Sequence, residues 1–386
     1  MINNNNYTAQ SEDLSARLKP LLPMIQQYAD QNHQNRDVAP EVVKAISDAG
    51  LFRCFQPKRW GGAEADPRTL YQLQNLIAQR CASTAWIFGV LSVQSFVLSL
   101  MDEQAQADVW GENPSTLVSS SFMPAGKVVL ADGGFRLSGQ WAFSSGCQHA
   151  DWVILGGLVP SVSEGQPPSM QLFLLPRSDY QIIDTWDTFG LRGTGSHDIA
   201  VDDAFVPGHR CFQPSPGIVA STDSSDLPAL YQLPWLYMFT STVANIGIGI
   251  AQAGLQAFLA IERKRLSFTG KPSKDDPAVM SVAARLSAAI EGSEAMLDRH
   301  ISNMLEGVES ATAMSMQQGL LQRTQLTSML RDLALIIDEM QLLLGGRGIR
   351  NDSPLTRIWL DMCAARAHPG NNPDMIAPTY GKLLLD

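Results

Sequence analysis

A histidine stands in an unusual setting near the end of the chain. His368 follows an Ala-rich segment and precedes Pro369, Gly370 and two asparagines, in the sequence ARAHPGNNPD. An imidazole with an ordinary pKa of about 6.5 can accept or donate a proton near neutral pH. Pro-Gly and Asn-Asn are also typical of a surface turn. The residues alone leave both interpretations open.

Runs of serine offer a second kind of chemistry. Ser119, Ser120 and Ser121 are consecutive, and Ser144 and Ser145 precede a glycine. A serine hydroxyl both donates and accepts hydrogen bonds, so these runs can hold a polar ligand. The structural alternative is a polar strand end before a glycine turn.

Arginines and glycines in the last third of the chain suggest a phosphate contact. Arg263 and Arg265 lie in the segment RKRLSF, and Arg347 follows Gly345 and Gly346 in LLGGRG. A guanidinium binds phosphate through paired N–H groups, and glycine lets a ligand approach the backbone closely. A solvated basic face is the alternative for the arginines. The glycines are not a dinucleotide-binding fingerprint, because no βαβ pattern surrounds them.

Composition excludes several classes of protein. The 386 residues carry a formal net charge of −10 with a pI near 5.1 and no polybasic run, which argues against nucleic acid as a partner. The five cysteines are scattered without metal-ligand or redox spacing, so we expect reduced thiols and a cytoplasmic location. The start of the chain lacks an apolar signal core. No cluster of His, Cys, Asp and Glu predicts a metal site.

Two apolar segments need to be tested as membrane spans. The segment 86–101 is too short and contains Gln94 and several serines, and 238–261 contains Asn245, two glutamines and many small residues. No Lys/Arg asymmetry or aromatic belt frames 238–261. We therefore expect no membrane contact and predict that 238–261 is a helix buried on nearly all sides.

Hydrophobic periodicity divides the chain into three parts. Residues 1–115 show helical spacing, 116–212 hold short strand-like runs between turn signals, and 213–386 return to long helical runs. A Ser/Asp/Pro-rich connector at 214–228 separates the last two parts. The sequence predicts a mainly α protein with a central β domain between two helical domains.

Five segments in this order resemble the acyl-CoA dehydrogenase fold over essentially the whole chain. They are DAGLFRCFQPKRWGG, GGFRLSGQWAFSSGCQHADW, TFGLRGTGSHDIAVDDAFVP, RKRLSFTGKP and QLLLGGRGIRNDSPLTRIWLD. The resemblance implies an N-terminal helical domain, a small β-barrel or sandwich and a C-terminal four-helix bundle. It also implies a flavin bound between the β domain and the bundle, and a homotetramer.

The chain departs from the dehydrogenases of this fold at their catalytic base. Those enzymes take an α-proton with a Glu, either near the C-terminus or on the buried helix of the last domain. Here the first place reads ARAHPGNNP, and the second, 238–261, contains no Asp or Glu. The segments STAW, SSS, FSSGCQHADW and RAHPGNNP resemble instead the oxygenase components of two-component flavin monooxygenases, most closely the secosteroid hydroxylase subgroup. That subgroup has His where this chain has Gln94, which bears on the substrate.

The resemblance assigns a role to each candidate residue. His368 would be the base for a ring hydroxyl, Ser145 would lie beside flavin N5, and Trp86 and Phe143 would wall the isoalloxazine. The implied cofactor contacts are Trp86, Ser119, Ser120, Ser121, Phe143, Ser144, Ser145, Arg263, Arg265, Gly345, Gly346, Arg347, His368 and Pro369. The implied substrate contacts are Gln94, Tyr237 and Phe239.

The function that follows is hydroxylation of an aromatic ring by O₂, with reduced FMN (or FAD) delivered by a separate reductase. The chain has no NAD(P)H fingerprint of its own, which agrees with outside delivery. A phenolic secosteroid-like compound, a simple phenol and an indole all remain open as substrates. The alternatives are an FAD-dependent acyl-CoA dehydrogenase or oxidase, and a non-catalytic flavin-binding protein of the same fold.

Overall fold

The N-terminal part of the protein is a set of helices. In the computed structural model they are α1 (Asn4–Leu18), α2 (Leu22–Asn35), α3 (Pro40–Asp48), α4 (Pro67–Ala78), α5 (Ala82–Ser99) and α6 (Glu103–Trp110). Asp66 caps α4, because its carboxylate accepts a hydrogen bond from the backbone N–H of Arg68. The structure describes residues 4–161, 165, 167–214, 226–267, 269–312 and 314–386, with side chains from residue 9. Most of the connector predicted at 214–228 therefore lies outside the described residues.

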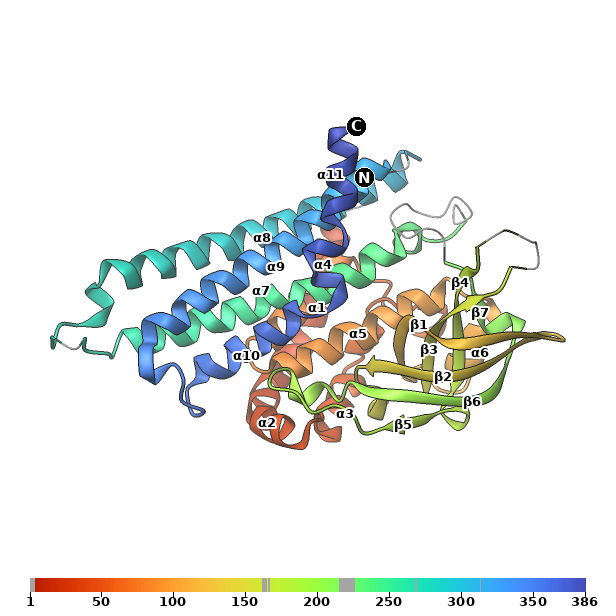
Figure 1. Cartoon of the computed structure of the whole chain (residues 1–386), viewed down its shortest axis with the longest axis horizontal. Helices are drawn as coiled ribbons and strands as arrows, with labels where there is room; N and C mark the ends of the chain where they lie inside the picture. Colours follow the sequence, from red (N-terminus) through yellow and green to blue (C-terminus); the bar gives the residue numbers. More distant parts are fainter. Residues whose placement is uncertain (1–3, 162–164, 166, 215–225, 268, 313) are drawn as a thin grey trace.

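A mixed seven-stranded sheet occupies the middle of the chain (Figure 1). Its strands are β1 (Val118–Ala131), β2 (Gly134–Ser144), β3 (Trp152–Val159), β4 (Ser169–Pro176), β5 (Gln181–Ile183), β6 (His197–Pro207) and β7 (Cys211–Phe212). Their order is β5-β6-β2-β1-β3-β4-β7. β1 and β3 are parallel, and the other neighbours in that order are antiparallel.

The long strand β1 joins two halves of this sheet. It pairs with β3 through residues 118–126 and with β2 through 127–131, and its register shifts between Ser121 and Gly126. The two halves enclose a separate core that includes Val128, Trp141 and Phe173. A Cβ at position 126 would lie 2.1 Å from Cζ2 of Trp141, so only glycine fits under that ring. The folded sheet is the small sandwich that the sequence predicts.

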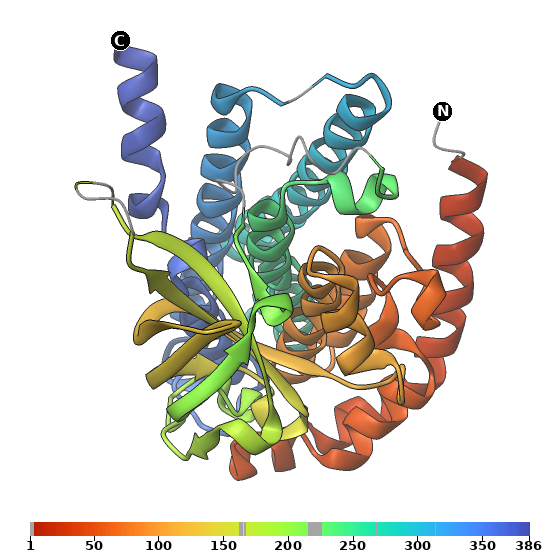
Figure 2. The same cartoon turned by 90° about the vertical axis from the view of Figure 1, so that its right-hand side faces the viewer.

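Long helices form the C-terminal part. They are α7 (Trp235–Glu262), α8 (Pro277–Glu309), α9 (Met316–Leu344), α10 (Pro354–Arg366) and α11 (Ala377–Leu385). α9 begins with a capping box, in which Ser315 and Gln318 each bond to the other's backbone N–H. α7, α8 and α9 run side by side, and α10 packs against α7 and α9 (Figure 1). The predicted four-helix bundle is confirmed, while α11 projects from the body with no buried residue (Figure 2).

The helices that precede the sheet in the sequence and those that follow it share one hydrophobic core. It joins Phe88 of α5, Ile246 of α7 and Leu330 of α9, and it also takes in Val118 and Leu174 of the sheet. The element bounds lie near the predicted divisions at 115 and 212. The division into domains 1–115, 116–212 and 213–386 stays a prediction, and the shared core shows that the two helical parts bury their apolar faces against each other.

Two helices are long and apolar enough to cross a membrane by length and composition alone. In Ala82–Ser99 and Trp235–Glu262, 94% and 61% of the apolar window lie buried within the fold. The core helix of a globular protein passes the same test, because it is apolar on nearly all sides. This burial agrees with the expected role of α7 as a core helix.

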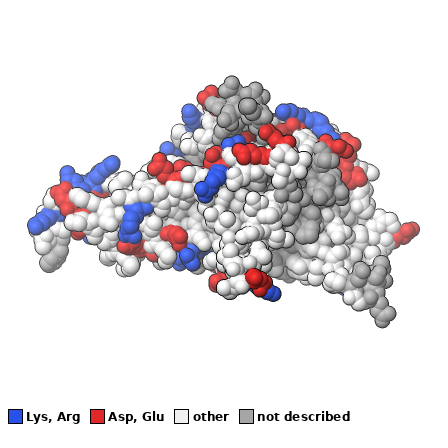
Figure 3. All heavy atoms as spheres, turned by 90° about the horizontal axis from the view of Figure 1, so that it is seen from above, with Lys and Arg blue, Asp and Glu red and all other residues white. Residues whose placement is uncertain are grey.

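The described surface mixes both signs of charge. On the face shown in Figure 3, Lys and Arg side chains are interspersed with Asp and Glu side chains. With 38 acidic and 28 basic residues in the chain, the surface is on balance acidic.

Candidate active site

Four of the predicted site residues come together between α5, α7, the sheet and the turn after α10. The ring centroid of His368 lies 5.6 Å from that of Trp86 and 6.1 Å from that of Phe239. The indole Nε1 of Trp86 donates a hydrogen bond to Ser145 Oγ at 3.0 Å. The structure therefore unites one aromatic wall, the predicted imidazole and the predicted N5 hydroxyl, although they are up to 282 residues apart in sequence.

His368 is held as a neutral imidazole with its proton on Nε2. It caps the short helix Pro369–Asn371, where its Nδ1 accepts a hydrogen bond from the backbone N–H of Gly370 at 3.0 Å. Burial, reinforced by the positive charge of Arg323, lowers the pKa of His368 to about 4. A ring nitrogen that accepts a hydrogen bond carries no proton, so the neutral ring bears it on Nε2. The predicted role of general base stays untested, but this geometry favours a role as N–H donor.

The turn that carries His368 is docked rather than solvated. Asn371 is 2% exposed, and its side-chain amide donates to Val243 O of α7 at 3.1 Å and to Ala365 O of α10 at 2.9 Å. Pro369, predicted as a cofactor contact, lies exposed at the start of the turn. The interpretation of ARAHPGNNPD as a plain surface turn is wrong, because its backbone is tied to two core helices.

Arg323 supports the same turn from α9, and the sequence analysis did not find it. Its guanidinium is 8% exposed and donates from Nη2 to Gly370 O at 3.1 Å. Nη1 has no hydrogen-bond partner among the described residues. Burial lowers the pKa of Arg323 to about 10, so the group is a cation at neutral pH. The segment around it, QQGLLQRTQLTS, mixes polar and apolar residues, so no sequence pattern marks this arginine.

Ser145 is one end of a row of three hydroxyls. Its Oγ lies 2.7 Å from Ser196 Oγ, which lies 2.7 Å from Thr194 Oγ1, and Thr194 donates to Leu191 O at 2.9 Å. Thr194 and Ser196 belong to the quoted segment TFGLRGTGSHD, but the sequence analysis did not single them out. No sequence pattern marks the backbone carbonyl of Leu191 on which the row ends.

The loop that carries this row is anchored to α10. Leu191 has a left-handed backbone (φ 50°), and its N–H donates to Asp361 Oδ1 at 2.6 Å. A Cβ at Gly190 would lie 2.1 Å from Leu360 O, so the loop touches the helix backbone. Burial raises the pKa of Asp361 to about 6. Since α10 also leads into His368, one helix positions both predicted catalytic residues.

Most of the other serines in the two runs form hydrogen bonds within the protein. Ser144 donates to Ser119 Oγ at 3.2 Å, and Ser121 donates to Ala142 O at 2.8 Å, which ties β1 to β2. Ser119, Ser121 and Ser144 are all buried. Ser120 points to the opposite face of β1 from its two neighbours, as alternation along a strand requires. The predicted cofactor contacts of the buried serines are thus indirect in this geometry.

Phe143 is placed to cover a flat ligand. Its side chain is 67% exposed, and its backbone has φ 67°, a strained value for a residue with a Cβ. Its ring meets that of Trp186 edge to face, with centroids 6.2 Å apart. An aromatic ring held exposed by a strained backbone fits the predicted wall of a flavin ring.

The predicted substrate residues Phe239 and Tyr237 lie in different surroundings in the structure. Phe239 joins a row of aromatic rings that runs through Phe122 to Trp235, with centroids 4.9 Å and 5.8 Å apart. Tyr237 lies about 200° around α7 from Phe239, and its hydroxyl is 2.8 Å from His300 Nδ1. The hydroxyl of Tyr237 is fully buried in this pair, so the prediction that it contacts substrate is wrong for this structure.

Gln94 lies on α5 two helical turns beyond Trp86. Its amide nitrogen donates to Val90 O at 3.2 Å, while its Oε1 is buried without a hydrogen-bond partner among the described residues. A buried acceptor without a donor is costly. Gln94 is 0% exposed, and the predicted contact between Gln94 and substrate stays a prediction.

The predicted phosphate residues lie at the far end of α7. Phe239 and Arg263 are 24 residues apart, which is about 36 Å along a helix axis. Arg265 there donates to Glu262 Oε1 at 2.7 Å and to Leu343 O at 2.9 Å, which brings it beside Gly345, Gly346 and Arg347. Within one chain, these residues and His368 cannot contact the same flavin. We call this second group, Arg263, Arg265 and 345–347, the tip cluster.

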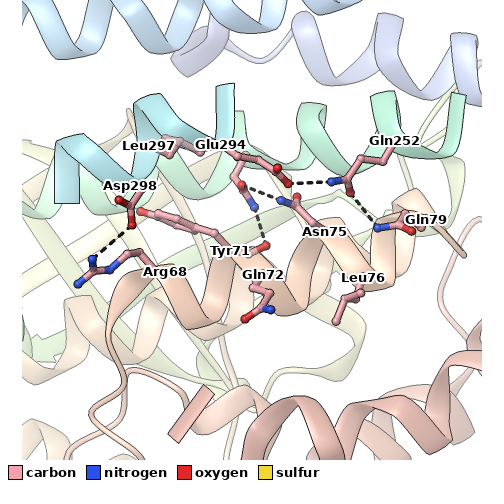
Figure 4. Close-up of a pocket in the computed structure, with 11 residues that line it drawn as sticks. Arg68, Tyr71, Gln72, Asn75, Leu76, Gln79, Gln252, Glu294, Leu297 and Asp298 are labelled. Atoms are coloured by element: carbon pink, nitrogen blue, oxygen red, sulfur yellow. Dashed lines mark hydrogen bonds and ion pairs between the residues drawn. The ribbon is translucent and has the colours of Figure 1, made fainter. Parts of the chain in front are cut away.

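A polar groove lies elsewhere, between α4, α7 and α8 (Figure 4). It has a volume of about 380 Å³. Gln252 bridges Glu294 at 2.8 Å and Gln79 at 2.8 Å across it, and Arg68 reaches Asp298 at one end. None of the predicted site residues lines this groove. No group of His, Cys, Asp and Glu suited to a metal ion occurs within the described ranges.

Comparison with known proteins identifies the family. Residues 241–373 match the family model "Acyl-CoA dehydrogenase, C-terminal domain". The oxygenase subunit HsaA of a flavin-dependent monooxygenase from Rhodococcus jostii (strain RHA1) is 34% identical over 373 residues, covering 95% of this chain and 96% of that protein. The chain belongs to the oxygenase subunits of flavin-dependent monooxygenases.

Two further relatives define the range of this family. The oxygenase component of an FADH(2)-dependent resorcinol hydroxylase from Rhizobium sp. (strain MTP-10005) is 29% identical, over 96% of this chain and 94% of that protein. The structure of XiaF from Streptomyces sp. in complex with FADH2 and glycerol has a TM-score of 0.92 and 25% identity, with 100% and 98% of the two chains covered. The resemblance drawn from the sequence motifs is confirmed.

This oxygenase subunit has side chains that fit a flavin. Ser145 is half-buried with a free oxygen lone pair, Phe143 is an exposed aromatic ring, and Trp86 stands between Ser145 and His368. Polar and aromatic groups of this kind suit the edge and the face of an isoalloxazine ring. Trp86, Phe143 and Ser145 would hold the ring system.

Proposed function

We propose that this oxygenase subunit hydroxylates an aromatic ring with O₂, using reduced flavin supplied by a separate reductase. When bound, reduced flavin supplies the two electrons with which O₂ gives one oxygen atom to the ring and the other to water. The observation that carries the proposal is the neutral His368 between Trp86 and Phe239. Aromatic rings around one N–H donor suit a flat apolar substrate with an oxygen or nitrogen substituent.

The residues of the site would make different contacts with the substrate. The row from Trp235 through Phe122 to Phe239 would bind the substrate ring by edge-to-face contacts. His368 would donate its Nε2–H to the substituent oxygen, and Gln94 Oε1 would accept from a hydroxyl or N–H. Such contacts fit a phenolic secosteroid-like compound, a simple phenol or an indole, and the resorcinol hydroxylase among the relatives is named for a simple phenol.

The acyl-CoA dehydrogenase alternative lacks its base in this structure. The carboxylate that α7 provides is Glu262, which is buried at the tip cluster, bonded to Arg265 and Ser273, and about 35 Å from Phe239 along the helix. No described contact brings an Asp or Glu to His368, Trp86 or Phe239. An α-proton of an acyl thioester would find no carboxylate to take it.

In a homotetramer, the tip cluster of one subunit could contact a flavin that another subunit holds. Gly346 has open space where a Cβ would stand, so packing within the chain does not require glycine there, whereas the backbone of Gly345 (φ 59°) does. Ile349, Leu342 and the last residues of α11 expose large apolar side chains, with Leu385 90% exposed. Leu342 and Ile349 lie beside the tip cluster, whereas α11 stands elsewhere on the molecule (Figure 1), and exposed apolar groups of this kind suggest surfaces that an assembly covers. In the proposed tetramer, the tip cluster of one subunit would bind the phosphate end of a flavin held at the active site of another.

The deciding experiment is anaerobic titration followed by exposure to O₂. The purified protein should bind dithionite-reduced FMN or FAD more tightly than the oxidised forms. With O₂ and a set of phenols and indoles it should then form hydroxylated product, and turnover from NADH should need an added flavin reductase. Oxidation of NADH by the chain alone, or bleaching of bound FAD by acyl-CoA, would contradict the proposal.

A further inference from the structure

The hydroxyl row from Ser145 to Leu191 has a preferred direction. At its inner end stands the carbonyl of Leu191, which can only accept, so the hydrogen bond at 2.9 Å uses the single hydrogen of Thr194. The contact of 2.7 Å between Thr194 and Ser196 then takes its hydrogen from Ser196. By the same rule the contact of 2.7 Å between Ser196 and Ser145 takes its hydrogen from Ser145.

At the outer end of the row, a further hydrogen bond occupies one lone pair of Ser145. The indole N–H of Trp86 can only donate, and it donates to Ser145 Oγ at 3.0 Å. Ser145 therefore gives its hydrogen to Ser196, receives one from Trp86 and keeps a single lone pair. Toward a ligand in the site, Ser145 is an acceptor only.

The opposite direction costs one hydrogen bond. If Thr194 donated to Ser196 and Ser196 to Ser145, the Ser145 hydrogen would point to the ligand, and the bond from Thr194 to Leu191 O would be lost. Thr194 is 1% exposed, so no bulk water replaces that bond. One hydrogen bond of ordinary strength corresponds to roughly a 2- to 12-fold preference for the direction described above.

We propose that Thr194 and Ser196 are positioning residues that hold Ser145 as an acceptor and so favour reduced over oxidised flavin. This rests on the proposed function. Two-electron reduction turns the flavin N5 from an acceptor, which an acceptor-only hydroxyl repels, into an N–H donor, which it matches. The carbonyl of Leu191, on the loop that α10 anchors, would thus set through the row which redox state of the flavin binds more tightly.

The loop around the row makes this preference rigid. Leu191 is fixed by its bond to Asp361 and by its left-handed backbone, and Gly146 N–H donates to Thr194 O at 2.9 Å. The terminal acceptor and the hydroxyl of Thr194 are thus each held by contacts that do not involve a ligand. A fixed acceptor at the buried end is what gives the row its direction.

The test measures dissociation constants of wild type and variants for FMN and FAD, each oxidised and dithionite-reduced, under anaerobic conditions. Thr194→Val removes the acceptor of Ser196, and Ser196→Ala removes the acceptor of Ser145. In Thr194→Val, Ser196 can turn its hydrogen to Ser145, and in Ser196→Ala the Ser145 hydrogen has lost its acceptor. In both variants the Ser145 hydrogen can then face the ligand. We expect the ratio of oxidised to reduced dissociation constants to fall by roughly 2- to 12-fold in each variant.

Matched variants separate this role from a structural one. Thr194→Ser keeps the hydroxyl and should keep the wild-type ratio. The double variant Thr194→Val/Ser196→Ala should fall no further than either single one, because each removes the same row. If Thr194→Val does not fold, Ser196→Ala decides.

The outcomes also separate this inference from the function on which it rests. A wild-type protein that binds neither FMN nor FAD in either redox state contradicts the proposed function. A wild-type protein that binds flavin while folded Thr194→Val and Ser196→Ala variants keep its ratio overturns the inference and leaves the function standing.

Discussion

The two ends of α7 were predicted to serve one cofactor, but they differ in nearly every physical respect. At the end near Phe239, the groups are mostly aromatic and neutral and are buried or half-buried, and the cation Arg323 lies under the His368 turn. At the end near Arg263, the tip cluster is exposed, cationic and rich in glycine. About 36 Å of helix separates Phe239 from Arg263.

The difference shows what each end can do. A water-poor cluster of rings and fixed hydrogen bonds can orient a substrate and control protons, because charges and dipoles act strongly there. An exposed pair of glycines beside arginines can hold a phosphate but cannot exclude water. We therefore expect changes at the first end to alter the chemistry and changes at the tip cluster to alter flavin affinity.

The largest effect should follow from His368→Ala. Loss of the imidazole should leave binding of reduced flavin nearly intact and lower the rate of hydroxylation by about 10²- to 10⁴-fold, as is typical when a proton-transfer group is removed. The measurement is single-turnover product yield against pH, started from the reduced flavin complex and O₂.

The pH dependence of that variant tells a base from a donor. If His368 accepts the proton of a phenol, the yield should recover as the phenol ionises by itself, near pH 10 for a tyrosine-like hydroxyl. If His368 donates its Nε2–H, as the bond from Gly370 favours, no recovery occurs. A variant that hydroxylates at the wild-type rate at pH 7 would remove His368 from the site.

A smaller effect of a different kind should follow from Arg265→Gln at the tip cluster. One charge-assisted contact, weakened because Arg265 is already paired with Glu262, should be worth roughly 3- to 10-fold in the dissociation constant of reduced FMN. Product formed per reduced flavin oxidised should not change, because the tip cluster is far from the reacting atoms.

Arg285→Gln is the matched control for this variant. Arg285 is also paired with a glutamate, Glu339, but lies half-exposed on α8 outside both ends of the comparison. Its replacement should change neither affinity nor product yield. A lowered product yield with unchanged flavin affinity in Arg265→Gln would contradict the division of labour between the two ends.

The sequence predicted the fold well because its elements are locally encoded. Helical spacing, the Asp66-Pro67 start and the turn signals of 116–212 each fix an element within a few residues. The shared core of α5 and α7 was not predictable, since both segments are apolar on all sides and periodicity does not say what covers them. Neither was the parallel pairing of β1 with β3, which depends on contacts far apart in sequence.

The candidate site was predicted in its residues more than in its geometry. His368, Ser145 and Trp86 were found through motifs, and they meet in space together with Phe239. Tyr237 was misplaced because a two-residue step along a helix turns the side chain to the opposite side. Arg323 and the Thr194–Ser196 row were missed because their roles exist only through backbone atoms, Gly370 O and Leu191 O, that no sequence pattern marks.

The smallest effect at neutral pH should come from the arginine at the buried end. Burial lowers the pKa of His368, and the positive charge of Arg323 lowers it further, to about 4. Arg323→Met removes the second cause and keeps the first, so the pKa of His368 should rise but stay below the ordinary value of about 6.5. At pH 7 the ring is neutral in both proteins, and the product yield should change by less than about twofold.

Below pH 6 the two proteins should diverge, and the direction follows from the site of protonation. A protonated ring carries a proton on Nδ1, which then faces the N–H of Gly370 and cannot accept its hydrogen bond. The acid limb of the product-yield profile should therefore move to higher pH in Arg323→Met than in wild type. Arg331→Met, which removes an exposed arginine of the same helix, should leave the limb in place. If both variants share the wild-type profile between pH 5 and 8, the charge of Arg323 does not control the protonation of His368. The proposed difference between Arg323, which would act on the chemistry, and the arginines of the tip cluster, which would bind the ligand, would then be wrong for Arg323.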